Sequence, residues 1–326
     1  MIYNKIKSFI QEQSENYSKM KEEFGSSFAL KTIFYSSVWR VFDIKSDLYI
    51  NSNLKLLKNE FCDLIDRYNN TPTNNSETQE SKIIWVCWWQ GLDSMPDFCR
   101  LCYNHLVNNT SPDYQVIIVT EKNYLNYVSL PPHIVDKYNK GIVKIQQFSD
   151  ILRQALLWQV GGVWMDATLF TLPGFLDNID TGKEFWSVNL GRVVKRRQLG
   201  QILTNCQWSS FLQVGKKNNI VNRFVYEAMV EYYTRHTHTI DYFLQNYLLR
   251  IAKENIKKAG EIFDQISISN THLYDLSLCI DDPFSKDKWD YMCSDTRIFK
   301  LTYKVPYSEI NGDAPTFYSY IKNLEL

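Results

Sequence analysis

Residues 148–170 read FSDILRQALLWQVGGVWMDATLF, a stretch that predicts a helix, a tight turn and a strand in direct succession. Helical spacing is present in its first half, at Phe148, Leu152, Ala155, Leu156 and Gln159. Gly161 and Gly162 then stop the helix, because glycine readily adopts the left-handed backbone found at helix ends. Val163–Asp166 reads as a strand, so the sequence places an aspartate where that strand ends.

Two further strands are expected on the N-terminal side of this stretch. Ile83–Trp89 is a continuous apolar and aromatic run that stops at Gly91, and Tyr114–Thr120 is a second such run. Runs of this kind are typical of strands that are buried on both faces, as in parallel sheets. A helical pattern separates them over Pro96–Asn108. Strands and helices that alternate at this spacing predict an α/β fold with right-handed crossovers.

A polar segment separates the N-terminal residues from these strands. The chain up to about Asn70 has helical periodicity, and Thr71–Ser81 is polar enough to be a linker or an exposed loop. We therefore predict a helical N-terminal region with its linker over residues 1–80 and an α/β domain over residues 81–326.

The pattern after Pro173 is mixed and contains no internal repeat. Helices are expected over Val221–Tyr233 and Ile240–Ala252, because apolar residues recur there at helical spacing. Residues 298–304, IFKLTYK, form a short candidate strand.

The composition limits the classes of protein to consider. The chain has 326 residues, of which 44% are hydrophobic, so a sizeable core is expected and wholesale disorder is not. Lys and Arg together number 36, as do Asp and Glu, and this balance lacks the basic character of nucleic-acid-binding proteins. Aromatic residues make up 15%, and their flat faces stack well on sugar rings and nucleobases.

The cysteines and the apolar segments bear on cellular location. The 7 cysteines follow no disulfide framework, and Cys99 and Cys102 form a lone CxxC without a second pair at zinc-finger spacing. Reduced, mostly buried thiols are therefore expected. No stretch approaches the ~20 apolar residues of a membrane span, and residues 1–24 lack the apolar core of a signal peptide. We expect a cytoplasmic protein, and a peripheral position at the inner face of the membrane is compatible with this sequence.

Three ionic residues of the opening stretch are candidates for a ligand site. Ligands of open α/β sheets bind beyond the carboxyl ends of strands, which is where Asp166 is placed. Asp150 and Arg153 share one face of the predicted helix. Carboxylates can bind sugar hydroxyls or a divalent cation, and arginine can bind phosphate oxygens. The alternatives are a structural salt bridge between Asp150 and Arg153 and a turn or cap role for Asp166.

This combination resembles a motif of sugar-nucleotide transferases with the GT-A fold, in which S/A-D-x-x-R on a helix precedes G-G-x-Y/W-x-D. It looks most like the capsular polysaccharide synthesis family, which is related to initiating mannosyltransferases and to the glucosyltransferase domains of large clostridial toxins. The likeness includes IIWVCWWQG (Ile83–Gly91) and VIIVTEKNYLNYV (Val116–Val128) and spans about residues 83–175. It implies a Rossmann-like, nucleotide-sugar-binding sheet flanked by helices, with the helical N-terminal region as an addition.

The resemblance implies a glycosyltransferase that moves a sugar from a nucleoside diphosphate sugar to a hydroxyl of a saccharide or lipid-linked saccharide. It also implies a place in the synthesis of capsular or other surface polysaccharides and retention of the anomeric configuration. Arg153 and Asp166 would act in catalysis. The residues implied in donor binding are Trp88, Trp89, Gln90, Asp150, Arg153, Asp166 and Thr168.

Asp241, in HTHTIDYFLQNYL, is a candidate residue on the acceptor side. This segment is similar to the same family, and a helix N-cap is the alternative role of Asp241. His236 and His238 precede it and are expected at the protein surface.

The motif departs from the DXD form at its third position, since the chain has Asp166-Ala167-Thr168. Relatives with a second aspartate there bind Mn²⁺ or Mg²⁺ together with the diphosphate, and the resemblance makes Asp166 the metal ligand. A neutral hydroxyl is a weaker ligand for a hard cation than a carboxylate, so the sequence leaves metal dependence open. A carboxylate from elsewhere or the basic run Lys195–Arg197 could substitute, and the alternative for that run is a solvated surface.

Other classes of function remain as alternatives. Thr168 is compatible with a catalytically inactive protein of the same fold that binds nucleotide sugars or glycans. A phosphotransferase is disfavoured because no GxxxxGK[ST] loop or GxGxxG turn follows either expected strand. The helical N-terminal region could instead serve an interaction role.

Overall fold

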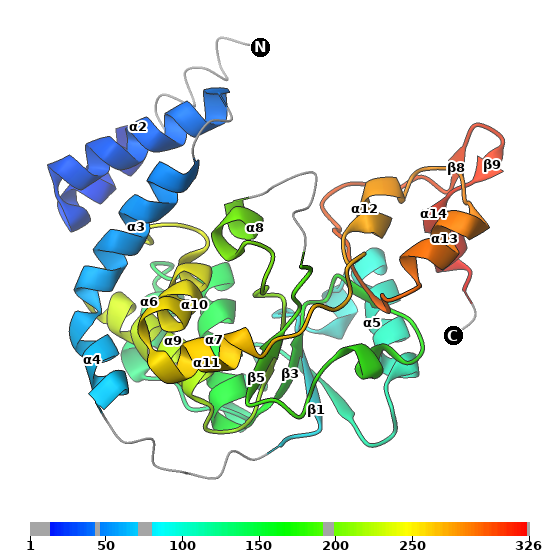
Figure 1. Ribbon diagram of the computed structural model, residues 1–326, viewed down its shortest axis with the longest axis horizontal. Coiled ribbons are helices and arrows are strands. Elements are labelled where there is room, and N and C mark those ends of the chain that lie inside the picture. The colour runs from blue at the N-terminus through cyan, green and yellow to red at the C-terminus, as the bar shows by residue number, and fades with distance from the viewer. Residues whose placement is uncertain (1–13, 43–45, 71–79, 192–198, 325–326) are drawn as a thin grey trace.

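The computed structural model describes residues 14–42, 46–70, 80–191 and 199–324 of the chain. A five-stranded sheet in the order β2-β1-β3-β6-β5 forms its centre (Figure 1). The strands of this sheet are β1 (Ile83–Cys87), β2 (Gln115–Val119), β3 (Gly162–Met165), β5 (Phe185–Ser187) and β6 (Leu212–Gly215).

The sheet is mostly parallel, as the apolar runs predict, but β2 lies at its edge, and Val119 is the one residue of this strand that is buried. Strand β1 pairs with β2 and β3 in parallel, with Ile84 opposite both Val116 and Val163. Strand β6 runs antiparallel to both β3 and β5. Ile84 and Trp85 in the middle of β1 are fully buried, which accounts for the unbroken apolar character of this segment.

The helices between the first three strands are α5 (Asp97–Asn109), α6 (Pro132–Asn139) and α7 (Ile145–Gln159). Helix α7 ends at the glycine pair, where Gly161 has φ 86° and Gly162 has φ 114°. A Cβ atom on Gly162 would lie 2.4 Å from the carbonyl oxygen of Ile83, so glycine is required for this close approach. The predicted succession of helix, turn and strand is confirmed.

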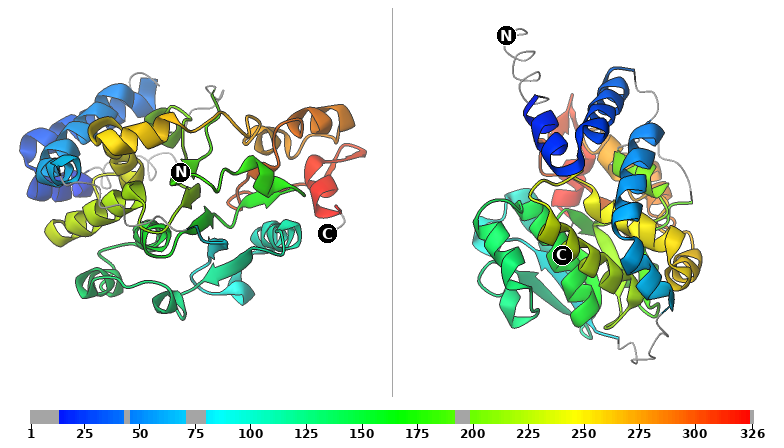
Figure 2. Two further views of the ribbon diagram at one scale, coloured as in Figure 1. Left: turned by 60° about the horizontal axis from the view of Figure 1, so that its bottom comes forward. Right: turned by 90° about the vertical axis from the view of Figure 1, so that its left-hand side faces the viewer.

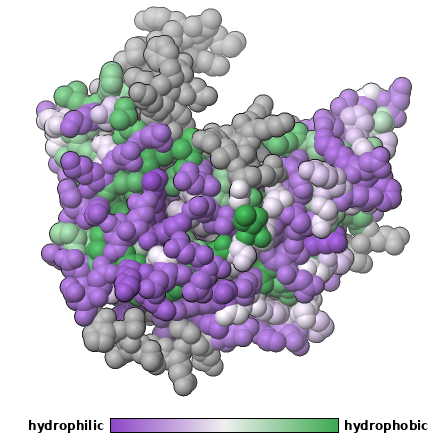
Figure 3. Space-filling view, viewed as in Figure 1, coloured by the Kyte–Doolittle hydropathy of each residue, from purple (hydrophilic) through white to green (hydrophobic). Residues whose placement is uncertain are grey.

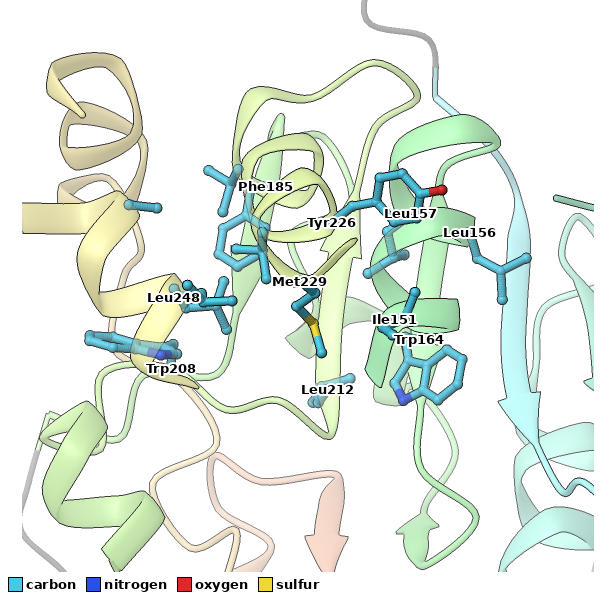
Figure 4. Close-up of a cluster of buried hydrophobic side chains, with 14 of the residues drawn as sticks. Ile151, Leu156, Leu157, Trp164, Phe185, Trp208, Leu212, Tyr226, Met229 and Leu248 are labelled. Atoms are coloured by element: carbon cyan, nitrogen blue, oxygen red, sulfur yellow. The ribbon is translucent and has the colours of Figure 1, made fainter. Parts of the chain in front are cut away.

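Further helices are stacked on the sheet in layers. Helix α7 packs against β3 and β6, α9 (Ile220–Arg235) packs against α7, and α10 (Leu244–Asn255) packs against α9. Figure 4 shows apolar side chains of these helices and of the strands gathered in one cluster, which is part of the main hydrophobic core. The sequence pattern predicts that the helix corresponding to α10 begins at about Ile240, whereas α10 begins at Leu244.

The N-terminal region is helical, as expected. Residues 14–24 are helical, and they are followed by α2 (Ser26–Phe42), α3 (Ser46–Glu60) and α4 (Cys62–Asn70). Helix α3 packs against α10, so the N-terminal region covers the outer helix layer (Figures 1 and 2). The predicted linker falls largely on residues 71–79, which lie outside the described residues, and the division of the chain at residue 80 stays a prediction.

A smaller second core lies beside the sheet. The two-stranded ribbon of β4 (Leu169–Thr171) and β7 (Ile298–Lys300) contributes Phe170 and Phe299 to this core, and both are fully buried. The remaining elements of this C-terminal half are α8 (Leu199–Thr204), α11 (Lys257–Asp264), α12 (Asp275–Cys279), α13 (Lys286–Met292), β8 (Ile310–Asn311), β9 (Ala314–Pro315) and α14 (Phe317–Lys322).

One face of the molecule is mostly hydrophilic (Figure 3), and the cysteines are reduced, as the sequence predicts. This face also has hydrophobic patches among the N-terminal helices. None of the helices in the described part of the chain combines the length and the apolar character needed to cross a membrane. All seven cysteines are free thiols, and the CxxC pair Cys99 and Cys102 is buried in α5.

Candidate functional site

The carboxylate of Asp166 stands at the carboxyl end of β3. Its backbone N–H donates to the carbonyl oxygen of Phe211 at 2.9 Å, and its own carbonyl accepts from Leu169 N–H at 3.0 Å. These bonds close a turn that connects β3 to β4 and carries Asp166 and Thr168. With 31% of its side chain exposed, Asp166 has a carboxylate that a ligand can reach.

Arg153 joins helix α7 to this strand end. Its Nη1 donates to Asp150 Oδ1 at 2.6 Å, and its Nη2 donates to Asp166 Oδ1 at 3.4 Å. The guanidinium carbon lies 4.6 Å from the centre of the Trp164 ring, and Trp164 Nε1 also donates to Asp166 Oδ1, at 3.0 Å. The structure therefore brings Asp150, Arg153 and Asp166 together around one guanidinium.

Gln245 holds the same guanidinium from a third element. Its Oε1 accepts from Arg153 Nη1 at 2.6 Å, and it lies in the first turn of α10. The Arg153 side chain is only 6% exposed, so its position is fixed by protein contacts before any ligand arrives. Sequence reasoning missed Gln245, because its local pattern marks only a buried face of a helix.

A second cation, Lys300, lies on the other side of Asp166. Its Nζ donates to Asp166 Oδ2 at 3.2 Å and to Thr168 Oγ1 at 2.6 Å. The pairing of β4 with β7 places Lys300 opposite Leu169 and so beside the turn. The sequence marks residues 298–304 as a short candidate strand, but no local signal indicates that Lys300 reaches the site.

The two carboxyl groups differ in their ionisation. Burial by itself would raise the pKa of Asp166, but the positive charges of Lys300 and Arg153 outweigh it and lower the pKa. Although 21% of the Asp150 side chain is exposed, burial of the carboxyl raises its pKa to about 6, against the opposing effect of Arg153. At neutral pH both groups carry charge, with Asp150 close to its point of protonation.

Two aromatic side chains follow strands whose neighbours carry the ionic cluster, Trp88 after β1 and Tyr303 after β7. The rings of Trp88 and Tyr303 are in edge-to-face contact, with centroids 5.7 Å apart. Partial burial and the charges of Asp150 and Asp166 raise the pKa of Tyr242, which also lies near Tyr303. Such rings can stack on a sugar or a base.

Several buried donors around the cluster have no acceptor among the described residues. They are Nε1 of Trp88, Nε of Arg153 and Nε2 of Gln245. Buried polar groups in native proteins are nearly always hydrogen-bonded, and an orphaned donor is therefore a sign of a missing partner. Other buried polar atoms, such as Trp208 Nε1 and Asn53 Oδ1, also have no partner among the described residues, so these three donors do not by themselves mark a ligand site.

Other predicted site residues lie elsewhere. Trp89 is buried among Tyr124, Tyr138 and Phe148, where its ring packs in the core. Gln90 is exposed in the turn after β1. The basic run at residues 195–197 lies outside the described residues.

The carboxylate of Asp241 forms a hydrogen bond with the N-terminal helix α3. Its Oδ2 accepts from the hydroxyl of Tyr49 at 2.6 Å, and its Oδ1 accepts from Phe243 N–H at 2.7 Å. Burial raises the pKa of Asp241, and the bond from Tyr49 opposes this rise. Asp241 thus lies on the loop that leads into α10, where Phe243 and not Asp241 is the residue before the helix.

The implied Mn²⁺ or Mg²⁺ can be tested against these ligands. Asp166 and Thr168 offer one carboxylate and one hydroxyl, and a nucleotide-bound Mg²⁺ takes its other oxygen ligands from phosphate groups and water. The carboxylate of Asp166 already accepts bonds from Arg153, Trp164 and Lys300. In the described part of the chain, no group of three or more His, Cys, Asp and Glu side chains is arranged to hold a metal ion. A divalent cation would have to displace these donors, and the Lys300 ammonium group at Thr168, to bind both Asp166 and Thr168.

Comparisons with known proteins match the chain to one family model and to five solved chains. A family model described as Capsular polysaccharide synthesis protein matches residues 42–321. Among solved structures the chain is similar to one entitled PaToxG Glycosyltransferase, with 16% sequence identity and a TM-score of 0.40, over 76% of this chain and 95% of that chain. No curated protein matches the chain.

Proposed function

Because the chain belongs to the capsular polysaccharide synthesis family, a family of glycosyltransferases, we propose that its donor is a nucleoside diphosphate sugar and its acceptor a saccharide or lipid-linked saccharide. The arrangement of Arg153 between Asp150 and Asp166, at the carboxyl end of a sheet strand, supports this proposal best. Ligands of α/β sheets bind at that edge.

The chemistry of sugar transfer matches the charges of this site. In the reaction the bond between the anomeric carbon and a diphosphate oxygen breaks, and the oxygen keeps the electron pair. Positive charge then develops on the sugar ring and negative charge on the diphosphate. A protein accelerates such a step mainly by holding charged groups in place before the reaction and by orienting the two substrates.

Each member of the cluster has a role that its exposure allows. Asp166 is the most exposed of the ionic residues, and its carboxylate can accept hydrogen bonds from ribose or sugar hydroxyls. Arg153 is buried, and its hydrogen bonds fix Asp150 and Asp166 relative to each other. Trp88 and Tyr303 provide aromatic faces for the base or the sugar.

We expect retention of the anomeric configuration from the resemblance to retaining transferases. The acceptor oxygen would then bond to the anomeric carbon from the face that the diphosphate leaves. The acceptor proton would pass to the departing diphosphate oxygen, so no separate base is needed. Asp241 stays a candidate on the acceptor side, and the neighbouring Tyr242 is largely exposed.

Transfer assays with purified protein test this proposal. A panel of nucleoside diphosphate sugars is incubated with the protein, and release of the nucleoside diphosphate is measured with and without saccharide acceptors. We expect release with at least one donor, and we expect Asp166→Ala to lower its rate at least about 100-fold, as for loss of a preorganised electrostatic group. Circular dichroism and thermal unfolding show whether the variant is folded.

A matched control is available on the surface. Asp113 is an exposed aspartate that forms an ion pair with Lys82, at 3.2 Å, and Asp113→Ala should leave the rate unchanged. If Asp166→Ala is fully active, the donor does not bind at this site in the way we propose. Binding of nucleotide sugars without hydrolysis or transfer would instead indicate a binding protein of the same fold.

A further inference from the structure

We propose that the ammonium group of Lys300 takes the place of a divalent cation at the donor site, so that sugar transfer by this protein needs no metal ion. The inference rests on the proposed function and adds to it the group that stabilises the leaving diphosphate. Neither the local sequence around Lys300 nor the D-A-T motif alone indicates this role.

The position of the ammonium group is the first argument. Lys300 Nζ lies between the first and third side chains of Asp166-Ala167-Thr168, 3.2 Å from Asp166 Oδ2 and 2.6 Å from Thr168 Oγ1. A metal ion bound by those two oxygen atoms would have to share this space with the ammonium group. Two cations so close repel each other strongly, and the effect is larger where water is partly excluded.

The second argument is that the position of Lys300 is set by the fold. Its backbone N–H donates to the carbonyl oxygen of Leu273 at 2.7 Å, and the next residue, Leu301, donates to the carbonyl oxygen of Thr168 at 3.1 Å. Its strand neighbours Ile298 and Phe299 are fully buried. The backbone of Lys300 is therefore anchored on both sides, so that its side chain starts from a fixed point beside the turn.

The third argument concerns the hydrogen-bonding capacity of the group. An ammonium group has three N–H donors, and Asp166 and Thr168 use two of them. The Lys300 side chain is 20% exposed, so a ligand can reach the remaining donor. The ring of Phe211, whose centre lies 4.7 Å from Nζ, covers one side of the cation in a cation–π contact.

The balance of charge supports the same reading. The cluster contains two carboxylates, Asp150 and Asp166, and two cations, Arg153 and Lys300. It is neutral without a metal ion. A diphosphate that approaches Asp166 meets a positive charge next to the carboxylate. A bound cation would stabilise the negative charge of the diphosphate in the same way.

In the reaction Lys300 would act on the leaving group. When the bond from the anomeric carbon to the diphosphate oxygen breaks, the electron pair stays on that oxygen, and the free N–H of Lys300 is available to a diphosphate oxygen. The acceptor oxygen forms the new bond to the anomeric carbon, and its proton passes to the diphosphate. Lys300 keeps its own proton throughout.

Calorimetry and transfer assays on the full chain test the inference. UDP, GDP, ADP and CDP are titrated into the wild-type protein in EDTA and in Mn²⁺, and transfer is measured under both conditions with the donor found in the panel. We expect affinity and rate in EDTA to lie within about twofold of the values in Mn²⁺. We expect Lys300→Met to lower the rate at least about 100-fold and the affinity for the nucleoside diphosphate at least about tenfold.

Two further variants make the test specific. Lys304→Met alters an exposed lysine of the same segment and should change neither quantity. Lys300→Arg keeps the charge and should retain more activity than Lys300→Met. Thermal unfolding shows whether each variant is folded, and the wild-type comparison in EDTA and Mn²⁺ does not depend on any variant.

The outcomes separate this inference from the proposed function. If a nucleoside diphosphate binds only with Mn²⁺, or if folded Lys300→Met transfers sugar as fast as wild type, the role of Lys300 is overturned and the donor site stands. If none of the four nucleotides binds under either condition and no donor is cleaved, the proposed function fails, and this inference fails with it.

Discussion

Asp150 and Asp166 lie on either side of one guanidinium, yet their pKa values shift in opposite directions. Asp166 has two cations as neighbours, and their charges lower its pKa in spite of burial. Asp150 has Arg153 alone, while burial and the charge of Asp166 act against its ionisation, so that its pKa rises to about 6. The number of cations at each carboxylate decides the difference.

This difference predicts a dependence of activity on pH. Below about pH 6 Asp150 becomes neutral, and Arg153 loses one of its two charged partners. We expect kcat/KM to fall as the pH is lowered from 7 to 5, and Asp150→Asn to lower activity at pH 7 and to flatten this decline. Asp113→Asn should retain the wild-type pH profile. A decline that is equally steep in Asp150→Asn would show that another group titrates.

At the scale of elements, buried polar residues connect α7, α9 and β6. Gln154 Nε2 donates to Gln213 Oε1 at 3.0 Å, and Asn222 Nδ2 donates to Gln154 Oε1 at 2.7 Å. Asn219 is the N-cap of α9, and its side chain also donates to the carbonyl oxygen of Leu157 at 3.2 Å, near the end of α7. These bonds fix the register between the helix that carries Arg153 and the helix layer outside it.

The N-cap of α9 gives a prediction on stability. Asn219→Ala removes a buried cap that accepts from Asn222 N–H at 2.8 Å, and it leaves the carbonyl group of Leu157 without this donor. We expect a loss of about 2 to 4 kcal/mol in the free energy of unfolding, measured by urea denaturation. Ser285→Ala, at the exposed N-cap of α13, should cost less than about 1 kcal/mol. Equal losses at the two caps would contradict the importance of burial here.

At the scale of the whole molecule, the N-terminal helices are joined to the rest of the chain by a histidine. His236 was expected at the surface, but its ring is largely buried between two glutamates. Its Nδ1 lies 2.9 Å from Glu23 Oε2, and its Nε2 lies 2.7 Å from Glu60 Oε1. Burial opposes the charge on His236, but the two glutamates outweigh it and raise the pKa above 6.5. Burial by itself would raise the pKa of Glu23, but hydrogen bonds from Thr237 lower it.

These shifts define a pH window for the attachment of the N-terminal region. The raised pKa of His236 means that its contribution to stability is complete below pH 6.5 and is lost as the pH rises through the folded pKa. The contribution of Glu23 is lost in the opposite direction, as the pH falls below 4.5. We expect His236→Gln to lower the melting temperature more at pH 6 than at pH 8.5.

The control for this prediction is another histidine. His133 bonds to the neutral hydroxyl of Thr234, and His133→Gln should show no such difference between the two pH values. An effect of His236→Gln that is the same at pH 6 and pH 8.5 would mean that the charge on His236 does not stabilise the protein.

Much of the fold and half of the site follow from local pattern. The apolar runs of β1 and β2, the helical spacing of α7 and the glycine pair are short-range signals, because backbone sterics and the burial of nearby side chains decide them. Asp150 and Arg153 are predictable as neighbours since they lie one turn apart on that helix. The glycine pair then brings the strand that ends at Asp166 back beside them.

The sequence by itself thus determined the sheet-forming segments, the helix with its two ionic residues and the aspartate at a strand end. Only the tertiary structure decided that Lys300 and Gln245 complete the cluster, that Trp89 packs in the core and that Asp241 bonds to the N-terminal helices. Lys300 reaches Thr168 through the pairing of β4 with β7, over 132 residues of sequence. Strand pairing and helix docking at such separations depend on which distant surfaces bury each other, and that is a property of the whole chain.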